Sequence, residues 1–216
     1  MTHITHILQQ AKEQLKNAEI GINRCYIDLS YNEFIELFVV FAEIEIKRLG
    51  KTHKFIIDKS NENILKWLYS YSTGTKSTQF NIDFNKGILL IGGFGVGKTL
   101  IMKAYISLIN SFDKKIIKSY HSKELTIILP EVGLHTLLKK PLFIDDIGKE
   151  NREVKVFGTI IQPFVDLISL RYEHNTWNFA TANYKLDTLK EKYGETITDR
   201  MKDIYNIIEL NGKSKR

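Results

Sequence analysis

Apolar residues recur with helical spacing over the first third of the chain. Within residues 3–20 the apolar positions that share one helical face are Ile4, Ile7, Leu8, Ala11, Leu15 and Ala18. A second apolar stripe follows Ser30 and Glu33, whose spacing is that of a capping box, and Gly50 can end that helix. Residues 64–71 predict a third helix that ends near Gly74. We therefore expect a helical N-terminal module over residues 1–75, whose stripes serve either as core or as a docking face for a partner.

The pattern changes after residues 72–79, which are rich in Ser, Thr and Gly and read as a loop. From residue 88 onward, short β-branched strands alternate with helices, which predicts a second domain, residues 76–216, built on a parallel sheet. Its five strands are expected at residues 87–91, 115–120, 142–145, 177–181 and 205–210. The longest helix is expected from Val154 to Glu173, with Pro163 as a kink or local break. The predicted fold class is α/β, with helices on both faces of the sheet.

A glycine-rich stretch follows the first of these strands and matches a phosphate-binding loop. The residues assigned to nucleotide binding are Gly92, Gly93, Phe94, Gly95, Val96, Gly97, Lys98, Thr99 and Leu100. Gly93 and Gly95 are expected to be glycines because the turn requires positive φ there. Lys98 should reach the β and γ phosphates, and the Thr99 hydroxyl should bind Mg²⁺. The alternative is a glycine-rich hairpin, but the strand before it and the helical pattern after it favour the phosphate loop.

Two consecutive acids end the strand at residues 142–145, at the edge where open α/β sheets bind ligands. After a phosphate loop, Asp145 is expected to hold Mg²⁺ through water, and Asp146 to act as the general base that orients or deprotonates the attacking water. The alternative is that one acid only caps the next turn. Asn183 follows the next strand, where its amide can hydrogen-bond the γ-phosphate and the water or simply serve a turn.

Composition adds three limits to this picture. Lys and Arg (31) exceed Asp and Glu (25), so the net charge of +6 suits an anionic partner such as nucleic acid, or simply a solvated surface. A single cysteine, Cys25, excludes an internal disulfide framework and a Cys-based zinc module. No apolar run approaches the ~20 residues of a membrane span, and the first residues lack a signal-peptide pattern. We therefore expect a cytoplasmic protein without a membrane partner.

The order of these motifs resembles the DnaC/IstB-like group of AAA+ ATPases, which contains helicase loaders and transposition ATPases. The stretches that carry the resemblance are residues 92–99, 142–148, 171–173, 181–183, 192–200 and 212–216. The resemblance covers roughly residue 88 to the C-terminus, and residues 1–80 show no motif of the group. It implies that Asn183 is the sensor-one residue, that Arg200 is an arginine finger acting on a neighbouring subunit, and that Arg216 is the sensor-two residue. Either Arg can instead be a surface charge.

The chain departs from the usual AAA+ pattern in two ways, which affect the expected turnover rate and the expected type of AAA+ protein. Asp146 stands where a catalytic Glu is commoner, and its shorter side chain suggests slow turnover. The few residues after Arg200 leave no room for a C-terminal helical lid, which is a trait of loaders.

The resemblance therefore implies an ATP- and Mg²⁺-dependent ATPase, slow and stimulated by partners, that binds single-stranded DNA and loads a replicative helicase. Subunits are expected to associate head to tail through Arg200, and the suggested DNA-binding lysines are Lys114, Lys115, Lys118 and Lys123.

Three alternatives stay open. One is a transposition regulator of the IstB type that binds duplex DNA and a transposase. The second is a small-molecule P-loop kinase, although the chain shows no Arg-rich lid for a phosphate acceptor. The third is an adaptor protein in which the nucleotide is only a structural ligand.

Overall fold

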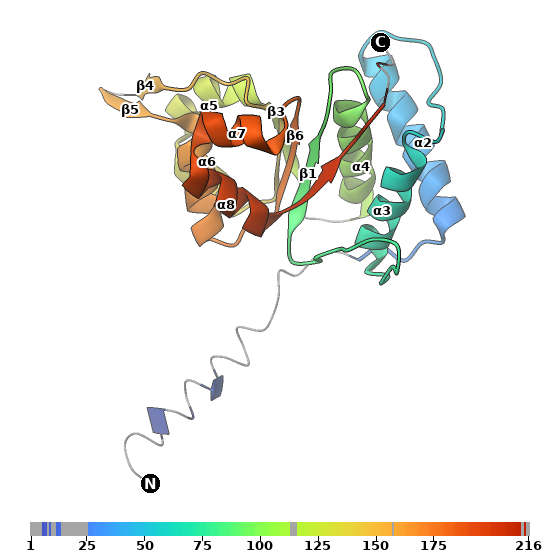
Figure 1. Ribbon diagram of the computed structural model, residues 1–216, viewed down its shortest axis with the longest axis horizontal. Helices are drawn as coiled ribbons and strands as arrows, with labels where there is room; N and C mark the ends of the chain where they lie inside the picture. Colours follow the sequence, from blue (N-terminus) through green and yellow to red (C-terminus); the bar gives the residue numbers. More distant parts are fainter. Residues whose placement is uncertain are drawn as a thin grey trace.

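A five-stranded parallel sheet forms the centre of the molecule in the computed structural model (Figure 1). The structure describes residues 26–112, 116–156, 158–212 and 214, together with residues 6, 7, 9, 12 and 13. The strands of the sheet, in spatial order, are β2 (Lys118–His121), β3 (Leu142–Ile147), β6 (Asn178–Ala182), β1 (Gly87–Ile91) and β7 (Tyr205–Glu209). All neighbouring pairs run parallel. The predicted fold class and all five predicted strands are confirmed.

Helices cover both faces of this sheet. The helices are α2 (Tyr31–Arg48), α3 (Glu62–Thr73), α4 (Lys98–Phe112), α5 (Leu125–Val132), α6 (Pro163–Glu173), α7 (Leu186–Tyr193) and α8 (Glu195–Ile204), with short 3₁₀ turns η1 (Ser122–Glu124) and η2 (Leu134–Leu137). Alternate side chains of β1 enter opposite layers because successive residues of a strand face opposite sides. Ile88 and Leu90 join the core under α2, α3 and α4, whereas Leu89 and Ile91 join the core under α5 to α8. Among the described residues, no helix is both long enough and apolar enough to cross a membrane.

The two described N-terminal helices form as the sequence predicts. The Glu33 amide donates to Ser30 Oγ (3.3 Å) and the Ser30 amide donates to Glu33 Oε2 (2.8 Å), which completes the capping box at the start of α2. Helix α3 ends at Gly74, which adopts the left-handed conformation (φ 69°). Both helices pack into the same hydrophobic core as α4 and β1. Most of the expected helix over residues 3–20 lies outside the described residues, and the division at residue 75 stays a prediction.

The long helix expected from Val154 to Glu173 is wrong. Its first part is an antiparallel hairpin of β4 (Val154–Val156) and β5 (Thr159–Ile161), which extends outward past α5 (Figure 1). Gly158 has a φ of 88° in the hairpin turn, a value that glycine adopts without strain. Pro163 occupies the first turn of α6, where no intrahelical partner for its nitrogen is needed, so it begins a helix instead of kinking one.

Arg171 on α6 is a fully buried cation that fastens the helix to the sheet. Its Nε donates to Asn178 Oδ1 (2.5 Å) at the start of β6, and its Nη2 donates to the Trp177 carbonyl oxygen (2.9 Å). Its Nη1 donates to the Leu137 carbonyl oxygen in η2. Burial lowers the pKa of Arg171 to about 10, so the guanidinium is charged at neutral pH and depends on these acceptors.

We predict that Arg171→Ala lowers the free energy of unfolding by about 3–5 kcal/mol, because buried acceptors lose their charged donor and a cavity remains. Denaturant unfolding at pH 7 measures the loss. The control is Arg152→Ala, which removes an exposed arginine beside β4 and should cost little. Equal losses in the two variants would show that Arg171 does not anchor α6.

Candidate functional site

The phosphate loop joins the end of β1 to the start of α4. Gly95 (φ 78°) and Gly97 (φ 99°) adopt left-handed conformations, so the chain turns sharply from the strand into the helix. Gly92 also has a positive φ (146°), but Gly93 does not, so the expectation for Gly93 is wrong. The first N–H groups of α4 have no partner within the helix and make its N-terminus suitable for an anion.

Lys98, the first residue of α4, links this loop to the neighbouring strand. Its side chain is buried, and Nζ donates to the carbonyl oxygens of Gly92 (2.9 Å) and Gly93 (2.6 Å). Nζ also donates to Asn183 Oδ1 (2.7 Å), which follows β6. The lysine therefore lies between the ends of two adjacent strands, close to the glycines of the loop.

Asp145 is a buried carboxylate that receives two hydroxyl groups. Thr99 Oγ1 donates to Asp145 Oδ1 (2.8 Å), and Thr181 Oγ1 donates to the same oxygen (2.6 Å). No group of three or more His, Cys, Asp or Glu residues that could bind a metal ion occurs in the described part of the chain. The Thr99–Asp145 pair nevertheless suits Mg²⁺, which proteins commonly hold with one or two side chains while phosphate oxygens and water complete the octahedron.

Asp146 turns away from Asp145 because its backbone is left-handed (φ 63°) and the register of β3 is irregular after Ile144. Two hydroxyls fix this backbone: the Asp146 amide donates to Thr181 Oγ1 (2.8 Å), and Ser122 Oγ donates to the Asp146 carbonyl oxygen (2.8 Å). The Asp146 carboxylate accepts a hydrogen bond from Asn183 Nδ2 at Oδ1. Consecutive acids are thus aimed at different partners.

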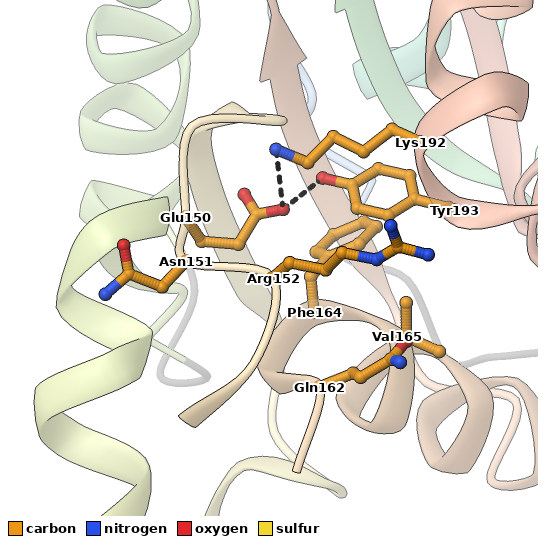
Figure 2. A pocket seen from close by; sticks show the side chains of 8 residues that line it. All are labelled: Glu150, Asn151, Arg152, Gln162, Phe164, Val165, Lys192 and Tyr193. Atoms are coloured by element: carbon orange, nitrogen blue, oxygen red, sulfur yellow. Dashed lines mark hydrogen bonds and ion pairs between the residues drawn. The ribbon is translucent and has the colours of Figure 1, made fainter. Parts of the chain in front are cut away.

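The buried carboxylate of Glu150 holds the loop that follows β3 (Figure 2). It accepts hydrogen bonds from the Gly148 amide (2.9 Å) and the Tyr193 hydroxyl (2.5 Å), and it lies 3.9 Å from Lys192 Nζ. Burial, together with the adjacent carboxylate, raises the pKa of Tyr193 far above its usual range, so its hydroxyl stays a proton donor. The loop is therefore fastened to the end of α7.

A cavity of about 640 Å³ connects the phosphate loop with the N-terminal helices. One wall consists of predicted site residues, namely Gly95, Val96, Gly97, Lys98, Thr99, Leu100, Asp145, Asp146 and Asn183. A second wall comes from the end of α2 and the loop after it, between Glu45 and Asn61. In that loop, Asn61 Nδ2 donates to the Ile56 carbonyl oxygen (2.9 Å) and its Oδ1 accepts from the Asp58 amide (2.9 Å), which orders the wall.

The structure does not bring every predicted residue to this cavity. Arg200 lies on α8, where its guanidinium is 3.6 Å from Glu173 Oε1 and 5.2 Å from the centre of the Tyr172 ring, and it does not line the cavity. Phe94 is exposed and also lies outside the lining. Arg216 lies outside the described residues.

Sequence reasoning missed the loop wall and three residues that support the acids: Ser122, Lys149 and His121. It also gave no role to Thr181, although this residue stood in a motif beside Asn183. The only sequence signal of the loop wall is the mainly apolar run at residues 55–58, which predicts no more than a short extended segment.

Comparison with known proteins shows the fold. No family model matches the chain, and no curated protein matches it. A crystal structure of the DnaC helicase loader is similar with a TM-score of 0.56 and 20% identity, covering 73% of this chain and 93% of that one. A putative primosome component from Streptococcus pyogenes serotype M3 is similar with a TM-score of 0.56 and 17% identity, covering 75% of this chain and 85% of that one. The replication initiator DnaA bound to AMPPCP and single-stranded DNA is similar with a TM-score of 0.53 and 13% identity, covering 74% of this chain and 49% of that one.

The chain therefore shares its fold with the DnaC helicase loader and the replication initiator DnaA. The resemblance inferred from the motifs is confirmed at the level of this fold.

We predict that Thr181→Val lowers the free energy of unfolding by about 1–3 kcal/mol, because one isosteric change leaves the Asp146 amide without its acceptor and removes a donor from Asp145. Denaturant titration measures this loss. Thr159→Val, at an exposed position on β5, is the control and should change stability little. If both variants match the wild type, Thr181 does not organise the acids.

Proposed function

We propose that this chain is an ATP-dependent loader of a replicative helicase, an AAA+ ATPase that binds single-stranded DNA. The observation that supports it most is the convergence of Lys98, Thr99, Asp145, Asp146 and Asn183 on one cavity. These are the residue types that hold and hydrolyse a nucleoside triphosphate in P-loop ATPases. The similarity in fold to a helicase loader and a replication initiator directs the proposal to DNA replication.

Each side chain at the cavity has a defined task in this proposal. Lys98 exchanges the Gly92 and Gly93 carbonyl oxygens for β- and γ-phosphate oxygens, while Thr99 and Asp145 hold Mg²⁺. Asp146 orients the attacking water and accepts its proton, and Asn183 donates to the γ-phosphate or to that water. Mg²⁺ supplies neutralisation of the phosphate charge.

The second wall of the cavity favours a nucleotide over a smaller phosphate compound. Leu49 and Ile56 line it and are the two most exposed large apolar side chains of the described residues, at 66% and 71%. Exposed apolar side chains in the cavity that contains the phosphate loop suit a purine base, which would cover them.

Arg200 supports assembly of several subunits around the nucleotide. Its side chain is 30% exposed, and its contacts with Glu173 and Tyr172 are surface interactions of the kind that contribute little energy. Since Arg200 does not line the cavity of its own subunit, a role at the γ-phosphate requires that it reach the site of a neighbour.

The sheet edge at β2 offers a basic surface for DNA. Lys118 and Lys123 are exposed there, and Lys139 and Lys140 are exposed just before β3. The Lys118 amide donates to the Pro141 carbonyl oxygen (3.3 Å), so these two lysine-bearing segments lie side by side. Lys114 and Lys115, also suggested for DNA binding, lie outside the described residues. A row of exposed lysines suits the phosphates of a single strand.

The ATPase rate per subunit should rise with protein concentration and with single-stranded DNA. Arg200→Ala should lower the stimulated rate by about 10²-fold or more while ATP binding persists, because the arginine acts on charge that develops in the transition state. Steady-state hydrolysis and nucleotide titration measure the two quantities. Lys202→Ala, another exposed cation on α8, is the matched control. A rate that is independent of concentration and of Arg200 would reject assembly through this residue.

Reversing the charge of two lysines at the basic edge should weaken single-strand binding. For Lys118→Glu with Lys140→Glu we expect the slope of log affinity against log salt to fall by about 0.7 for each phosphate that the protein no longer neutralises. Fluorescence anisotropy over a salt series tests this, with Lys47→Glu, an exposed lysine on α2, as the control. An unchanged slope would place the DNA elsewhere, and a preference for duplex would favour the transposition alternative.

A further inference from the structure

The carboxylate of Asp146 is engaged on both oxygens. Oδ1 accepts from Asn183 Nδ2, and Oδ2 forms an ion pair with Lys149 Nζ, three residues further along the chain. His121 Nε2 lies 3.8 Å from Oδ2 as well. Since Asn183 also accepts a hydrogen bond from Lys98, a continuous chain of contacts runs from Lys98 through Asn183 and Asp146 to Lys149.

The position of Lys149 is determined by the residues on either side of it. Gly148 has a φ of 96°, which turns the chain back toward Asp146 after β3. Glu150, the next residue, is locked by the Gly148 amide, Tyr193 and Lys192 (Figure 2). The main chain of Lys149 is therefore held at both ends, and little freedom is lost when its side chain pairs with Asp146.

Lys149 also touches the phosphate loop. Its ammonium lies 5.1 Å from the centre of the Phe94 ring, within range of a cation–π contact. Phe94 belongs to the glycine-rich loop but does not line the cavity, and Lys149 does not line it either. The lysine thus lies outside the cavity and connects its acid with the loop that receives the phosphates.

We propose that Lys149 is a positioning residue that holds Asp146 in a resting arrangement and limits basal hydrolysis. This inference rests on the proposed ATPase function. A general base must accept a hydrogen bond from the attacking water, and the ammonium on Oδ2 competes for the same lone pairs. The ion pair is not needed to place Asp146, because Thr181 and Ser122 already fix its backbone.

The test compares the basal turnover of Lys149→Met and Lys149→Gln with that of the wild type. We expect kcat to rise about three- to tenfold, because the charge-assisted pair that restrains the acid is removed, while the KM for ATP changes less than about twofold. Lys149→Arg keeps the charge and should keep the low rate. Lys155→Met, at an exposed lysine on β4, should also leave the rate unchanged.

Because Lys149 is proposed to act through Asp146, the rise in kcat must depend on Asp146. Asp146→Asn should therefore abolish this rise in the Lys149→Met background. Equal or lower kcat in both neutral variants, with melting temperatures like that of the wild type, would overturn the restraint while leaving the ATPase proposal intact. A wild type without turnover, alone or with DNA, together with inactive Lys149 variants, would reject both the ATPase proposal and the restraint.

Discussion

The buried ammonium group of Lys98 imposes the constraint around which the site is built. A buried charge must be paired, and here the Gly92 and Gly93 carbonyl oxygens and the Asn183 side chain accept its protons. The site can supply these acceptors because parallel strands β1 and β6 end side by side, with Ile91 in register with Ala182. A phosphate oxygen that takes the place of a carbonyl oxygen exchanges one hydrogen bond of Lys98 for another, so binding does not begin with an unpaired charge.

The strands and the phosphate loop could be predicted because each depends on neighbouring residues: an apolar run followed by glycines and Lys98–Thr99 has the same local meaning in many folds. The segment Val154–Ile161 was misassigned because its β-branched residues also fit a helical stripe, and only the turn at Gly158 and the start of α6 at Pro163 separate the two possibilities. The cavity wall at Leu49 and Ile56 depends on the packing of α2 against α4, which no local spacing encodes.

The short sequence Arg171–Tyr172–Glu173, which contributed to the resemblance, acquires a physical explanation from the structure. Arg171 points into the core and anchors α6 through Asn178 and the Trp177 carbonyl oxygen. Tyr172 and Glu173 follow it on the helix and contact Arg200 on α8. Arg171 thus fixes the position of α6, and α6 carries the two residues that contact Arg200, the proposed arginine finger. A substitution of Arg171 that shifts α6 should therefore also shift the Arg200 side chain.

The N-terminal helices and the phosphate loop are physically connected, wherever a domain boundary is drawn. Glu45 near the end of α2 pairs with Arg48 (2.5 Å), reaches Ser107 on α4 (3.4 Å) and lines the cavity. Helix α4 begins at Lys98, so α2 contacts the helix that carries the phosphate-binding lysine. Any ligand that fills the cavity touches both, and a partner that moves α2 must move one wall of the proposed nucleotide site. If a partner binds α2 and a nucleotide binds the cavity, their coupling needs no separate relay, because α2 contributes to both surfaces.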